Sequence, residues 1–167
     1  DAAMISFRDE IDASRGDVLC HPQTAPNVAD QVAAHVLWLS DAPMIPGRSY
    51  LLKCGSRKVP AEVTALKHRI DVNSGAHIAA TALNSNEIGF VNLALTAPIA
   101  IDAFAENRDT GSFILIDRMT NATIGAGMIS FVLRRASNIH PQKLEVDRAA
   151  RSALKRHKPA VLWFTGL

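Results

Sequence analysis

The stretch Val59-Pro60-Ala61-Glu62-Val63-Thr64-Ala65 alternates apolar and polar side chains. Successive side chains of a β-strand point to opposite faces, so one face of this stretch can be buried while the other meets water. The pattern indicates a strand of an antiparallel sheet that is solvated on one side. Such a strand needs hydrogen-bonding partners elsewhere in the chain.

Partner strands are predicted on both sides of this stretch. Short apolar runs separated by turn residues extend from residue 3 to about residue 134, a rhythm typical of an antiparallel sandwich or barrel. Gln31–Leu39 places Val32, Ala34, Val36 and Trp38 on one face. The other candidate strands are Tyr50–Cys54, Ile88–Leu95, Ile99–Phe104, Phe113–Ile116 and Ile124–Leu133, with Asn107–Gly111 as a polar connection.

The segments that flank this barrel, residues 28–135, predict separate units. Residues 1–24 are interpreted as the C-terminal end of another barrel, because Asp17–Cys20 follows a turn and resembles the last strand of a unit that begins before residue 1. Residues 136–158 form a linker with a helix over about 141–157, and Pro159 ends this helix. Residues 159–167 are expected to open an α/β architecture with the strand Val161–Phe164.

Composition and charge limit the possible functions. Of the 167 residues, 48% are hydrophobic, which is enough for a packed core, and the formal net charge of +2 gives no reason to expect nucleic-acid binding. The uncharged stretch Ile88–Ile101 is too short to cross a bilayer. Cys20 and Cys54 stand apart and are predicted to be buried free thiols of a cytoplasmic protein. Both ends of the sequence look cut.

Phosphate-loop chemistry is suggested only at the end of the chain. An apolar strand that runs into Thr165-Gly166 is how a phosphate-binding loop begins, although an ordinary strand-to-turn glycine is the better interpretation on spacing alone. Gly125-Ala126-Gly127 lacks the third glycine and the following helix of a dinucleotide fingerprint, so close strand packing is expected there.

Other chemical groups have structural interpretations that we favour. The six histidines show no metal-ligand spacing; His35 is predicted to be a half-buried ring and His68 part of a solvated edge. The acidic residues around Asn107–Gly111, together with Asp117, are expected to bond their own turns rather than to form a catalytic carboxylate pair. No catalytic residue and no metal ligand is therefore predicted.

Four motifs resemble a known family. The stretches Pro46–Lys53, Lys67–Asn73 and Gly111–Arg118 resemble the GTPase subunit of bacterial sulfate adenylyltransferase, and Asn121–Met128 is similar to the end of its last barrel. That subunit is itself similar to translation elongation factors, in which a GTP-binding domain precedes two β-barrels. The resemblance implies that residues 28–135 are the third-domain barrel.

Residues 146–167 resemble the linker and opening strand of adenylylsulfate kinase. The intact protein would then make adenylylsulfate from ATP and sulfate, coupled to GTP hydrolysis, and phosphorylate adenylylsulfate with a second ATP. This implies GTP, ATP and Mg as cofactors and a small catalytic subunit as partner. The chain itself would be inactive, with only Gly166 and Leu167 contributing to an incomplete ATP phosphate loop. An RNA- or protein-binding barrel like those of translation factors is the alternative.

Overall fold

The computed structural model describes residues 6–8 and 10–135, and in this part the chain is mainly β. Two short helical turns accompany the strands: a 3-10 turn at Pro22–Thr24 and α1 (Arg108–Gly111), whose first turn is capped by the Asn107 side chain. The polar connection predicted at Asn107–Gly111 thus contains a helical turn. The strands are β1 (Asn27–Trp38), β2 (Ser49–Cys54), β3 (Arg57–Ile70), β4 (His77–Ile78), β5 (Ile88–Ile101), β6 (Ser112–Ile116) and β7 (Thr123–Arg135).

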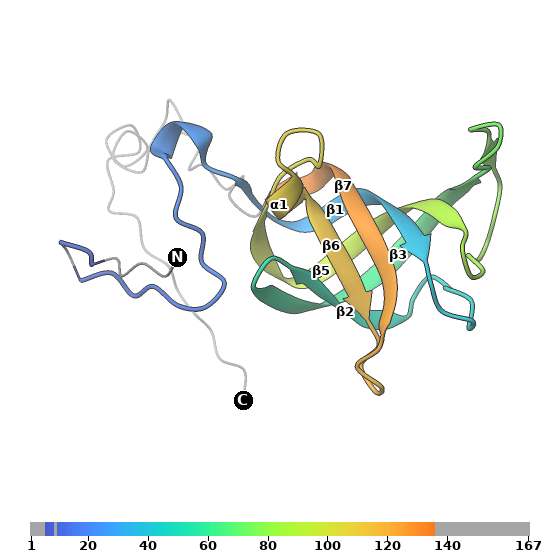
Figure 1. The fold of residues 1–167 in the computed structure, drawn as a ribbon, viewed down its shortest axis with the longest axis horizontal. Coiled ribbons are helices and arrows are strands. Elements are labelled where there is room, and N and C mark those ends of the chain that lie inside the picture. The colour runs from blue at the N-terminus through green and yellow to red at the C-terminus, as the bar shows by residue number, and fades with distance from the viewer. Residues whose placement is uncertain (1–5, 9, 136–167) are drawn as a thin grey trace, which may run out of the picture. The chain divides into compact units, whose positions relative to one another are not determined.

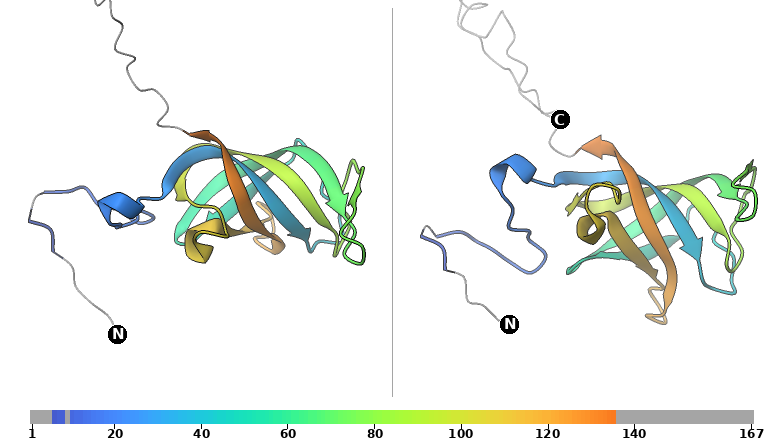
Figure 2. Two further views of the ribbon diagram at one scale, coloured as in Figure 1. Left: turned by 90° about the horizontal axis from the view of Figure 1, so that it is seen from above. Right: turned by 45° about the horizontal axis from the view of Figure 1, so that its top comes forward.

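Six of these strands close into an antiparallel barrel, as predicted. The sheet order is β2-β6-β7-β1-β5-β3-β4, and β4 lies outside the ring. An additional pairing of β2 with β3 closes the ring of the other six strands (Figure 1). Two further views show the same strands wrapping around one interior (Figure 2). Closure removes the exposed sheet edges that would otherwise template aggregation.

The interior is filled by alternate residues of the strands. On β1, Val32, Ala34, Val36 and Trp38 are all buried, which confirms the predicted face. The Trp38 ring meets the Tyr50 ring edge-on, with centroids 5.5 Å apart. Trp38 also donates its indole N–H to the Ala42 carbonyl at 2.7 Å, so its polar atom is satisfied inside the core.

The alternation that identified β3 is interrupted at Thr64. Val59, Ala61 and Val63 are buried as predicted, but the register of β3 against β5 shifts between Val63 and Ala65. A bulge changes which side chains face inward. Ala65 is consequently only partly buried, and Leu66 packs against the core instead.

Pro98 does not end a strand, contrary to the prediction of two strands at Ile88–Leu95 and Ile99–Phe104. The single strand β5 (Ile88–Ile101) covers the first stretch and the start of the second, while residues 102–104 lie beyond its end. Pro98 lies where the β1 register jumps from Ile99 to Ala94. The β5 residues between these pairs have no ladder partner on β1, so a missing N–H costs no hydrogen bond there.

The predicted strand at Asp17–Cys20 is wrong. These four residues form no strand, and Leu19 is 63% exposed. None of the described strands pairs with this segment, and an unpaired extended segment has no ladder to hold it. Cys20 is exposed, so its predicted burial is also wrong, whereas Cys54 is buried as expected. The predictions for residues 136–167, including Gly166 and Leu167, lie outside the described residues.

Candidate functional site

Three of the four family-like motifs lie in neighbouring strands. Pro46–Lys53 contains most of β2, Gly111–Arg118 contains β6 and Asn121–Met128 enters β7. β6 pairs with β2 through Leu51–Ile116 and with β7 through Phe113–Gly127. These three motifs therefore lie side by side in three adjacent strands of the barrel.

The turn that follows β6 is held together by the Asp117 side chain. The Asp117 carboxylate accepts hydrogen bonds from the backbone N–H groups of Met119 and Thr120 at 2.9 Å, and these bonds hold its pKa below the usual range. Arg48 from the neighbouring motif lies 3.6 Å away and forms an ion pair with it. As predicted, this carboxylate bonds its own turn.

Gly125 and Gly127 are packing glycines, which confirms the interpretation from sequence. A Cβ atom placed on Gly127 would lie 2.2 Å from the Phe113 ring, and one on Gly125 would meet the Leu37 carbonyl oxygen at 3.3 Å. Phe113 is buried in the core. The glycines therefore admit a large ring between strands.

The outer surface of the barrel carries the most unusual arrangement, a row of rings that crosses five adjacent strands. We call it the aromatic row; it consists of Phe131 of β7, His35 of β1, Phe90 of β5, His68 of β3 and His77 of β4. The centroids of His68 and His77 are 3.8 Å apart, and Phe90 lies 4.9 Å from His35 and 5.5 Å from His68. The Phe131 ring lies at the far end of the row, with its centroid 6.2 Å from that of Phe90.

Two histidines of the row, His35 and His68, favour the neutral state. Burial lowers the pKa of His35, and the nearby His77 lowers it further. The pKa of His68 is lowered by the same two causes and by His35 as well. Because neutral rings stack without repulsion, the uncharged forms of His35 and His68 suit their contacts with Phe90.

A serine approaches one of these rings. The Ser130 Oγ and His35 Nδ1 atoms are 3.0 Å apart, within hydrogen-bond distance. Among the described residues no carboxylate pairs with His35 to orient it, as a catalytic serine–histidine pair would require. The bond fixes the tilt of the ring in the row.

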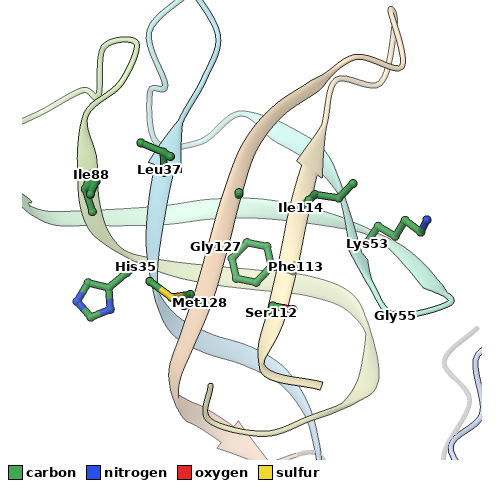
Figure 3. A pocket seen from close by; sticks show the side chains of 11 residues that line it. His35, Leu37, Lys53, Gly55, Ile88, Ser112, Phe113, Ile114, Gly127 and Met128 are labelled. Carbon is green, nitrogen blue, oxygen red and sulfur yellow. The ribbon is translucent and has the colours of Figure 1, made fainter. Parts of the chain in front are cut away.

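An open apolar groove with a volume of about 600 Å³ adjoins the row (Figure 3). Its lining includes Leu37, Ile88, Ile114 and Met128, and it meets the row at His35. Among the described residues that line it, Lys53 is the one with a charged side chain. Row and groove together make one largely apolar outer face that runs from β2 and β6 over β7, β1 and β5 to β3 and β4.

Sequence reasoning missed this face. It placed His68 on a solvated edge, whereas the ring is half-buried between His77 and Phe90. The bulge between Leu66 and His68 turns the ring toward Phe90, and a bulge has no clear signature in the residues. The available signal for this face was that histidines and phenylalanines stand at outward-facing positions of the alternating strands.

Within residues 6–8 and 10–135, no group of three or more His, Cys, Asp or Glu side chains could hold a metal ion. In the same part of the chain, no helix has the length and hydropathy needed to cross a membrane.

Comparisons with curated proteins give long matches to relatives that are much longer than this chain. The chain is 54% identical over all 167 residues to the bifunctional enzyme NodQ of Azospirillum brasilense, of which it covers 27%. It is 50% identical over 166 residues to the bifunctional enzyme CysN/CysC of Xylella fastidiosa, again covering 27%. Sulfate adenylyltransferase subunit 1 of Aeromonas hydrophila is 42% identical over 159 residues, and 33% of its length is covered.

Solved structures and a family model agree on the fold. A crystal structure of Sup35 complexed with GDP superposes with a TM-score of 0.61 at 15% identity, over 68% of this chain and 28% of that one. At such identity the likeness shows the fold alone. The model of the GTP-eEF1A C-terminal domain-like family matches residues 31–130, which lie almost entirely in the barrel. This chain therefore belongs to the GTP-eEF1A C-terminal domain-like family.

Proposed function

We propose that this chain is an internal piece of a bifunctional sulfate-activating enzyme. Residues 28–135 are the third-domain barrel of its sulfate adenylyltransferase GTPase subunit, and residues 1–24 end the preceding barrel. Residues 136–158 link to residues 159–167, the first strand of the adenylylsulfate kinase. The supporting observation is the 54% identity to a bifunctional enzyme over all 167 residues, far beyond the 31–130 that the family model matches.

The identities also favour a bifunctional protein over a single-function subunit. They are 50% and above for the bifunctional relatives and 42% for sulfate adenylyltransferase subunit 1. In the proposed enzyme, ATP and sulfate give adenylylsulfate and pyrophosphate, coupled to GTP hydrolysis. The terminal phosphoryl group of a second ATP is then transferred to the 3′-hydroxyl of adenylylsulfate. GTP, ATP and Mg serve the intact cytoplasmic protein, and a small catalytic subunit is its partner.

The barrel has a structural and interface role in this proposal, and the chain alone is inactive. The apolar outer face supports the interface role, because its exposed rings suit protein contact rather than a polar substrate. Gly166 and Leu167 start the kinase phosphate loop, where a glycine lets the backbone approach the phosphates.

The test is an assay of both reactions in the longer natural polypeptide with its small subunit. Gly166→Val should abolish phosphorylation of adenylylsulfate while GTP-dependent adenylylsulfate formation continues, because a branched side chain obstructs the loop. Met119→Val, at an exposed turn of the barrel, should leave both reactions unchanged. Normal kinase activity in Gly166→Val, or a polypeptide without either reaction, would contradict the proposal.

A further inference from the structure

A pocket with positively charged side chains lies at the turn that joins β2 to β3. Its volume is about 610 Å³. Four cationic side chains and one hydroxyl group line it, those of Arg15, Lys53, Arg57, Lys58 and Ser56. Among the described residues that line this pocket, none is acidic. The electrostatic potential in the pocket therefore favours a negatively charged ligand.

Two of these charges are placed together by the hairpin itself. The register of β2 against β3 sets Lys53 directly opposite Lys58. Like charges at directly opposite positions of an antiparallel pair repel each other and destabilise the pair. Within the described part of the chain, neither ammonium group forms an ion pair with a carboxylate. An anion bound between the two lysines would remove this repulsion.

Arg57 is held at the edge of the same pocket. A Cβ atom placed on Gly16 would lie 2.6 Å from the Arg57 Cδ atom, so the arginine side chain packs against the backbone of the turn at residues 14–17. The Asp17 carboxylate of that turn accepts a hydrogen bond from the Ser14 N–H at 2.8 Å. No carboxylate of a described residue forms an ion pair with Arg57. Its guanidinium group is therefore positioned and still able to donate to a ligand.

The rest of the pocket is apolar. Its remaining lining residues are Val59, Ile114 and Ile116. Lys53 pairs with Ile114, so a charged and an apolar side chain stand next to each other on β2 and β6 (Figure 3). An inorganic anion gains nothing from aliphatic side chains, whereas an aromatic base can cover them and stack on a guanidinium group. The volume is also that of an ordinary small-molecule site.

The distribution of charge favours a small ligand over a nucleic acid. The whole chain has a formal net charge of +2. Elsewhere on the barrel, Arg48 and Arg69 are paired with carboxylates. Domains that bind nucleic acids carry a basic stripe or face that follows the phosphate backbone. Here the unpaired cations gather around one pocket, which suits a ligand of that size.

We propose that the pocket at the β2–β3 hairpin binds a small nucleotide that carries at least two negative charges on phosphate or sulfate groups. The anionic groups lie between Lys53 and Lys58 and accept hydrogen bonds from Arg57, and the base covers Ile114 and Ile116. The proposal goes beyond the proposed function and does not depend on it, because binding here requires no reaction.

Isothermal titration calorimetry of the 167-residue chain with ADP, in the absence of Mg, tests the proposal. ADP should bind, whereas adenosine and inorganic pyrophosphate should each bind at least about tenfold more weakly, because each fills only part of the pocket. Failure of ADP to bind at millimolar concentration would overturn the proposal. Pyrophosphate that binds as tightly as ADP would also overturn it, since the base would then have no place in the pocket.

Substitutions locate the site. Lys53→Gln and Lys58→Gln should each weaken ADP binding at least about tenfold. Lys67→Gln removes the same charge from an exposed position of β3 outside the pocket, and should bind ADP like the native chain. Both hairpin variants should be at least as stable as the native chain in denaturant, because each relieves the repulsion between the lysines. Unchanged ADP affinity in both would refute the site.

Two other outcomes have distinct signatures. In NMR spectra of the chain, ADP should shift the amide resonances of residues 53–58 and of Ile114; shifts confined to residues 159–167 would place the nucleotide elsewhere and overturn the proposal. Oligonucleotides whose affinity rises with length would indicate a nucleic-acid surface and overturn it as well. ADP binding at the hairpin would support the site even where the longer polypeptide fails both assays of sulfate activation.

Discussion

The Phe113 ring occupies the space that a side chain at position 127 would need, with its Cζ atom 2.2 Å from the place of a Cβ on Gly127. The two residues face each other across β6 and β7, so neither strand can move away without breaking the ladder. Gly127→Ala should therefore destabilise the barrel by about 1–3 kcal/mol through overpacking. Denaturant unfolding of the chain measures this.

The neighbouring Ala126→Ser is the matched control, because residue 126 lines the outer groove. Its free energy of unfolding should change by no more than about 0.5 kcal/mol. A Gly127→Ala variant as stable as the native chain would show that Phe113 finds another rotamer.

Tyr50 and Trp38 should respond differently to loss of their polar atoms. Among the described residues the buried Tyr50 hydroxyl has no hydrogen-bond partner, so Tyr50→Phe should be neutral or slightly stabilising. Trp38→Phe removes both the bond to the Ala42 carbonyl and part of the core volume, and should cost about 3 kcal/mol or more. Thermal or denaturant unfolding compares them; a destabilised Tyr50→Phe would reveal a partner for the hydroxyl.

The pKa values of His35 and His68 should respond to the loss of His77. Replacing His77 by Ala removes a neighbouring charge and a ring that covers His68, so the pKa of His68 should rise toward its ordinary value of 6.5. The pKa of His35 should rise less, because the His77 ring stacks on His68 and not on His35. NMR titration of the imidazole resonances checks both, and His21→Ala is the control. A pKa of His68 that falls would contradict the stacked arrangement.

Stability should decrease with acidification in two windows. The folded-state pKa values of His35 and His68 are lowered, so the unfolded chain binds more protons as the pH falls below about 6.5, and stability declines there. The pKa of Asp117 is lowered too, so its contribution is present above about pH 3.9 and is lost as the pH falls through the folded value.

Unfolding midpoints between pH 3 and 8 report these two windows. His35→Gln with His68→Gln should flatten the upper window. Asp117→Asn should reduce the lower one, to which Asp71 and Glu87, whose pKa values are also lowered, contribute as well. A midpoint that rises on acidification from pH 7 to pH 5.5 would contradict the assignment to the histidines.

The barrel could be predicted because the buried face of each strand is visible in the sequence as a local alternation of apolar and polar side chains. Val32 to Trp38 and Val59 to Val63 alternate and are buried accordingly. What could not be predicted depends on pairing between distant residues. The neighbouring strand, and not the residues themselves, decides three features. These are the bulge after Val63, the tolerance of Pro98 within β5, and the absence of a strand at Asp17–Cys20.

The aromatic row illustrates the same limit at the candidate site. His35, His68 and His77 have no informative spacing along the chain, yet the register of four strand pairs places them beside Phe90 and Phe131. The Asp117 turn was foreseeable because its hydrogen bonds reach only to Met119 and Thr120.

The first and last strands of the barrel are antiparallel neighbours, with Ala29 at the start of β1 opposite Arg135 at the end of β7. The polypeptide thus enters and leaves at one point on the barrel, and a pulling force on the two flanking segments loads the β1–β7 hydrogen bonds one after another, like a zipper. Such a barrel should yield at low force, and it could be excised or inserted in a longer protein without separating the segments on either side of it.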